Sequence, residues 1–63
     1  MLDMKSSFAG AADIVAHAET AAQHIKELKA ACANGDKSAA GRSLRQAISE
    51  LQLARAMLRT GLD

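Results

Sequence analysis

The sequence predicts an all-α protein, an antiparallel two-helix hairpin that assembles as a dimeric four-helix bundle. The 63-residue chain has no proline and is rich in alanine and other strong helix formers. Its apolar residues recur every three or four positions, which is the period of an amphipathic helix and not of a strand. An Asn-Gly-Asp segment interrupts this pattern once. We therefore expect a single helical-hairpin domain over residues 1–63.

The first helix is expected over about residues 6–33. We expect its main apolar seam to face the second helix and to consist of Phe8, Ala11, Val15, Ala18, Ala22, Ile25 and Cys32. Ile14, Ala21 and Leu28 widen this seam on one side.

The turn is expected at residues 34–36. Asn34 and Gly35 both tolerate the left-handed backbone conformation in which many helices end. Asp36 is a suitable N-cap for a second helix over about residues 37–60. The expected seam of this helix is Ala40, Leu44, Ala47 or Ile48, Leu51, Ala54 and Leu58. Because the connection is so short, the two helices must be antiparallel neighbours.

The apolar content is weak for a core, because fifteen of the apolar residues are alanines. A lone hairpin of this size is marginal, and a single cysteine cannot form a disulfide within the chain. We therefore expect a homo-oligomer, with a dimer favoured. The expected oligomer interface is Ile14, Leu28, Gly41, Leu53, Met57 and Leu62. Gly41 costs its helix about 1 kcal/mol relative to alanine, and a close crossing by another helix would explain its presence.

The stretch from Asn34 to Ser43, NGDKSAAGRS, superficially suggests a phosphate-binding loop. Five residues separate its two glycines where that motif has four, an arginine replaces the motif's lysine, and no strand pattern precedes it. The segment GDKSAAGRSLRQAI instead resembles the turn and second helix of a tetratricopeptide repeat, with matching residues at Gly35, Asp36, Ala40, Leu44 and Ala47. The resemblance implies hairpin geometry. It does not extend to the first-helix signature, so no peptide-binding groove is implied.

Two features could carry chemistry. A stripe on the first helix combines histidines with carboxylates at helical spacing: Asp13, His17, Thr20, His24 and Glu27. We interpret it as a solvated face with weak ion pairs, because it points away from the expected seam. A metal or small-molecule site between protomers is the alternative. Cys32 is expected to be a buried structural residue. We assign no catalytic residue, no metal ligand and no cofactor, and we expect no enzymatic activity.

The second helix is basic, and its arginines favour a binding role. The residues expected to contact a partner are Arg42, Arg45, Leu53, Met57 and Arg59. We expect a small adaptor or inhibitor that docks a helix face onto another protein. The alternative is a nucleic-acid-associated regulator that uses the arginine-rich face, although no aromatic residue interleaves to stack bases. The net charge is +1, and no apolar run approaches a membrane span, so we expect a cytoplasmic protein.

Overall fold

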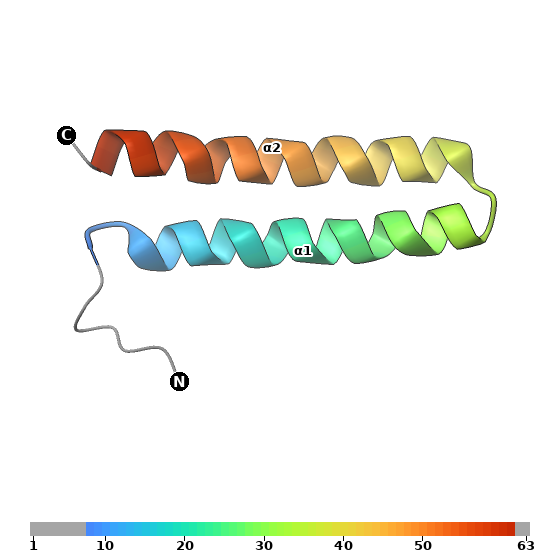
Figure 1. Ribbon diagram of the computed structural model, residues 1–63, viewed down its shortest axis with the longest axis horizontal. Coiled ribbons are helices and arrows are strands. Elements are labelled where there is room, and N and C mark those ends of the chain that lie inside the picture. The colour runs from blue at the N-terminus through green and yellow to red at the C-terminus, as the bar shows by residue number, and fades with distance from the viewer. Residues whose placement is uncertain (1–7, 62–63) are drawn as a thin grey trace.

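The computed structural model describes residues 8–61 as two long helices, α1 (Ala11–Ala33) and α2 (Lys37–Gly61). They run antiparallel and lie side by side along their whole length, joined by one tight turn (Figure 1). At 1.5 Å per residue each helix is roughly 35 to 38 Å long. The expected all-α hairpin is confirmed.

The first helix begins later than the sequence suggested. Gly10 precedes it with φ of 84°, a left-handed conformation that a residue with a side chain rarely adopts. The backbone N–H of Ile14 donates to the carbonyl of Gly10 at 3.0 Å, so the helical hydrogen bonds start there. Residues 8–10 were expected to be helical and are not. Residues 6 and 7 lie outside the described part of the chain.

The turn lies at residues 34–36, where it was expected, but only Gly35 takes the left-handed conformation, since Asn34 has φ of −88°. Gly35 has φ of 71°, and its N–H donates to the carbonyl of Cys32 at 3.1 Å. The N–H of Asp36 donates to the carbonyl of Ala31 at 2.8 Å, which completes a Schellman motif. Oδ1 of Asp36 then accepts from the N–H of Ala39 at 3.0 Å and caps α2. Asp36 thus closes one helix and opens the next.

The buried centre of the contact between the helices is made of small residues. Among residues 8–61, the buried apolar residues are Ala21 and Ala31 of α1 and Ala47 and Ala54 of α2. Ser43 is buried with them. Half-buried residues complete the contact: Ile14, His17, His24 and Leu28 on α1, and Ala40, Glu50 and Met57 on α2. Together with the buried residues, they recur at alternating intervals of three and four along each helix. This spacing is that of a coiled-coil seam, and small side chains allow the helix axes to approach closely.

The predicted seam was therefore wrong for its large residues. Val15 and Ile25 of α1, and Leu44 and Leu51 of α2, were expected between the helices but are exposed. Cys32 was expected to be buried and is exposed as well. The physical reason is that alanine and serine let the two backbones come together, which displaces the larger apolar side chains to the flank of the contact.

Candidate functional site

Most of the exposed large apolar side chains gather on one side of the hairpin, while Leu53 lies one turn from Ser49 on the other side of α2. On α2, Leu44, Leu51 and Leu58 are seven residues apart and form one stripe, with Ile48 beside it. On α1, Val15 and Ile25 flank the small exposed residues Ala18 and Ala22. We call this surface, formed by Val15, Ala18, Ala22, Ile25, Leu44, Ile48, Leu51 and Leu58, the apolar face. Its six large side chains are between 38% and 47% exposed.

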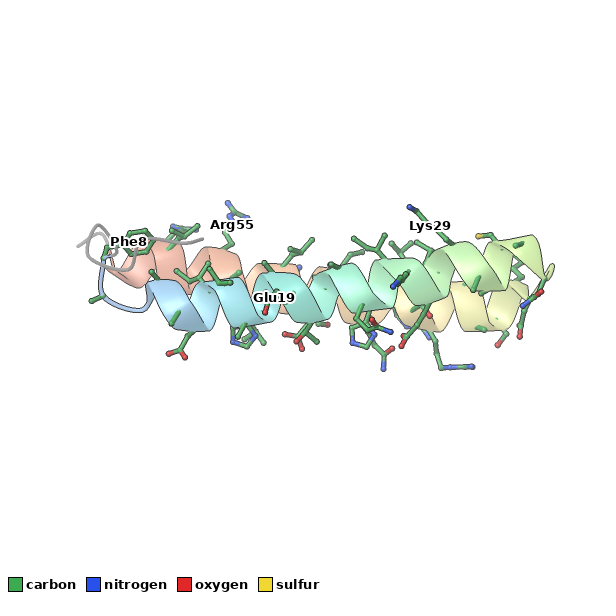
Figure 2. The ribbon with its side chains drawn as sticks, turned by 90° about the horizontal axis from the view of Figure 1, so that it is seen from below. Phe8, Glu19, Lys29 and Arg55 are labelled. Atoms are coloured by element: carbon green, nitrogen blue, oxygen red, sulfur yellow. The ribbon has the colours of Figure 1, made fainter. Side chains whose placement is uncertain are left out.

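Figure 2 shows the same segregation from the edge of the two-helix layer. Carbon-only side chains line one face of the layer, where Phe8, Lys29 and Arg55 also project, and oxygen-bearing side chains gather along the opposite face. Lys29 and Arg55 extend long alkyl stems from this surface and carry their charges out to water. The apolar face is therefore bordered by positive charge.

The opposite side of the hairpin is polar and contains a shallow concavity of about 430 Å³. We call it the arginine depression. Its lining comes from both helices and consists of His24, Arg42, Arg45, Gln46, Ser49 and Glu50. Every one of these side chains can hydrogen-bond, and only Glu50 carries negative charge. The depression can therefore bind an anionic group.

Two histidine–carboxylate pairs lie on this polar side. Nδ1 of His17 donates to Oε1 of Glu50 at 2.7 Å and links α1 to α2. Nδ1 of His24 donates to Oε1 of Glu27 at 3.0 Å within α1. The hydrogen bond from His24 holds the pKa of Glu27 below its ordinary value of 4.5. The expected pairing within α1 is confirmed, but the link to Glu50 was missed, because the stripe borders the helix contact and does not point away from it.

The residues expected to bind a partner are divided by the structure. Arg42 and Arg45 lie together in the arginine depression. Leu53 and Arg59 are exposed outside it, whereas Met57 is half-buried, with its Cε 4.0 Å from the position that a Cβ at residue 10 would occupy. The five residues therefore do not line one site.

The residues expected in the oligomer interface are also dispersed. Ile14, Leu28 and Met57 are half-buried along the contact between the helices, and Gly41 is half-buried on α2. Leu62 lies outside the described residues. The residues of the apolar face were all noticed in the sequence, but most were assigned to the contact within the hairpin. The signal in the sequence was that Leu44, Leu51 and Leu58 recur every seven residues, on a stripe beside that of Ala47 and Ala54.

Within residues 8–61, no group of three or more histidine, cysteine, aspartate or glutamate side chains is placed to hold a metal ion. Neither described helix is long and apolar enough to cross a bilayer. No protein-family model, curated protein or solved structure matches the chain significantly.

Proposed function

We propose that the protein is a non-enzymatic interaction module whose apolar face docks onto the apolar face of a second copy, which gives a dimeric four-helix bundle. One observation carries this proposal. The six large side chains of the apolar face are 38% to 47% exposed, whereas the buried apolar residues among those described are alanines alone. A surface of this kind is typical of a protein–protein interaction site.

The energetics favour a covered apolar face. A fully buried leucine or isoleucine side chain contributes about 1.5–3 kcal/mol, and the single hairpin realises only part of this. A core of alanines contributes much less, and chains of this size depend on additional stabilisation. Docking Leu44, Ile48, Leu51 and Leu58 against another apolar surface supplies it.

A second copy is a suitable occupant because the apolar face combines large and small side chains. Its α2 half carries leucines and isoleucine, and its α1 half carries Ala18 and Ala22 between Val15 and Ile25. A twofold axis along the hairpin places α2 of one copy over α1 of the other, so that large residues meet small ones. The four helices then form a bundle with a continuous apolar centre.

The experiment compares aspartate substitutions on the two sides of α2. Leu51→Asp inserts a charge into the apolar face, and we expect it to abolish assembly as measured by sedimentation equilibrium. Ser49→Asp introduces the same charge on the polar side and serves as the control, for which we expect an unchanged mass. Equal masses for both variants and the unmodified chain would show that the apolar face does not mediate assembly.

A further inference from the structure

The arginine depression lies on the opposite side of the hairpin from the apolar face. Arg42 and Arg45 line it from α2, and His24 lines it from α1. In a bundle held together by the apolar face, this side of each copy remains on the outside. We propose that the depression binds an acidic helix of a partner protein, with Arg42 and Arg45 each binding one of two carboxylates that are a helical turn apart.

The two arginines have unused hydrogen-bonding capacity. Neither forms an ion pair with any residue in the range 8–61, where both ion pairs are histidine–carboxylate pairs. Glu50, the acidic residue in the lining, already accepts a hydrogen bond from His17 at 2.7 Å. The two guanidinium groups together present fork-shaped donors that match carboxylate oxygens. Nearby Gln46 and Ser49 add neutral donors.

The spacing of the arginines indicates the geometry of the ligand. Residues three apart on a helix have Cβ atoms about 5–6 Å apart, which applies to Arg42 and Arg45. Two glutamates three or four positions apart on a partner helix have the same separation. A helix lying along α2 can therefore place one carboxylate on each guanidinium, and bidentate pairing fixes its register.

The charge distribution favours an acidic helix over nucleic acid. Glu50 lies in the depression and Glu27 lies beside His24, so a phosphate backbone, which is charged at every nucleotide, would meet carboxylates as well as arginines. A helix can instead place its carboxylates at the two arginines alone. Arg55 projects on the same side as Phe8 and Lys29, beside the apolar face, and does not extend the basic surface (Figure 2). No aromatic residue accompanies the arginines on α2 for stacking on bases.

This inference deepens the proposed function, because it gives the chemistry of a partner, but its readout is independent of assembly. The probe is a fluorescent alanine-rich helical peptide with glutamates three and four residues apart on one face. A second peptide has the same composition, with the glutamates distributed around the helix. We expect fluorescence anisotropy to give tighter binding of the first peptide, with affinity that decreases as the salt concentration rises.

The matched variants each remove two arginines from α2. We expect Arg42→Gln combined with Arg45→Gln to weaken binding of the first peptide by about tenfold or more, through loss of charge-assisted hydrogen bonds. Arg55→Gln combined with Arg59→Gln lowers the net charge equally but leaves the depression intact, so we expect less than about twofold weakening. Circular dichroism confirms that both variants remain helical, and sedimentation confirms that their assembly is unchanged.

Three results would overturn the proposal. The first is equal weakening by the two double variants, which would mean that net charge alone accounts for peptide binding. The second is equal affinity for the two peptides, which would remove the requirement for spacing. The third is that duplex DNA binds with dependence on Arg42 and Arg45 while the acidic peptides do not, which would assign the depression to phosphate.

Discussion

Ala47 and Leu51 lie one helical turn apart on α2, and the smaller residue is buried while the larger is exposed. Ala47 is 2% exposed and Leu51 is 47% exposed. In a protein whose core is complete, the opposite order is expected, because leucine gains more free energy from burial than alanine does. The inversion identifies two seams on α2, one of small residues that faces α1 and one of large residues that is exposed.

The first prediction concerns how two copies are oriented. Packing large residues against small ones requires the turns of the two hairpins to lie at the same end of the bundle. Cys32 is exposed near the turn and follows Ala18 and Ile25 at seven-residue spacing, so the two copies of Cys32 then approach each other. We expect a short bismaleimide to cross-link them, as detected by mass spectrometry.

The control for this cross-link moves the thiol to the polar side by combining Cys32→Ser with Ser49→Cys. This variant should assemble and remain uncross-linked, because Ser49 lines the arginine depression. A chain that has dimer mass but does not cross-link through Cys32 would place the two turns at opposite ends.

The second prediction concerns the cap at the turn. Asp36→Ala removes the carboxylate that accepts from the N–H of Ala39, and we expect it to lower the free energy of unfolding by about 1 kcal/mol. Asp36→Asn retains a capping oxygen and should cost much less. Thermal or urea denaturation at fixed chain concentration measures both. Equal losses for alanine and asparagine would mean that the side-chain cap contributes nothing.

The third prediction concerns Gly41, where a side chain has room within the hairpin. An added Cβ would meet only Nη1 of Arg45, at an ordinary contact distance of 3.8 Å. We expect Gly41→Ala to stabilise α2 by up to about 1 kcal/mol. Gly41→Leu adds a large side chain seven residues before Ile48, at the border of the apolar face, and should weaken assembly. If the leucine variant has unchanged mass and increased stability, Gly41 is not part of the interface.

The turn and the hairpin could be predicted because they depend on local chemistry. Asn34, Gly35 and Asp36 have strong conformational and capping preferences, and each acts within a few residues of its position. The helix contact could not be predicted in the same way, because two stripes of helical period run along each helix. The predicted seam of α2 mixed the two stripes and placed Leu44 and Leu51 in the interior with the alanines. Close approach of the backbones instead favoured Ala47 and Ala54 and left the leucines exposed.

The candidate site, too, could be predicted only in part from the sequence. Arg42 and Arg45 could be grouped from their spacing on one helix, but the contributions of His24 and Glu50 depend on how α1 and α2 are aligned. A single sequence has no local signal for that alignment. The link between His17 and Glu50 spans 33 residues and emerges only when the two helices are packed.

The fourth prediction concerns pH. The pKa of Glu27 is lowered below its ordinary value of 4.5, chiefly by the hydrogen bond from His24. A carboxyl group with a lowered folded-state pKa stabilises the protein above its ordinary pKa, and this contribution is lost as the pH falls through the folded-state value. We therefore expect Glu27→Gln to reduce stability near pH 6 and to converge with the unmodified chain in acid, where both carry a neutral side chain. A constant difference across this range would contradict the role of ionised Glu27.

The central claim is that two copies bury their apolar faces against each other. Sedimentation equilibrium of the unmodified chain at micromolar concentration tests it most directly, with circular dichroism recorded over the same dilution series. We predict twice the 6.6 kDa mass of one chain, and a helical signal that decreases together with the mass on dilution. A helical, cooperatively folded species that retains the mass of one chain at every concentration would contradict the claim.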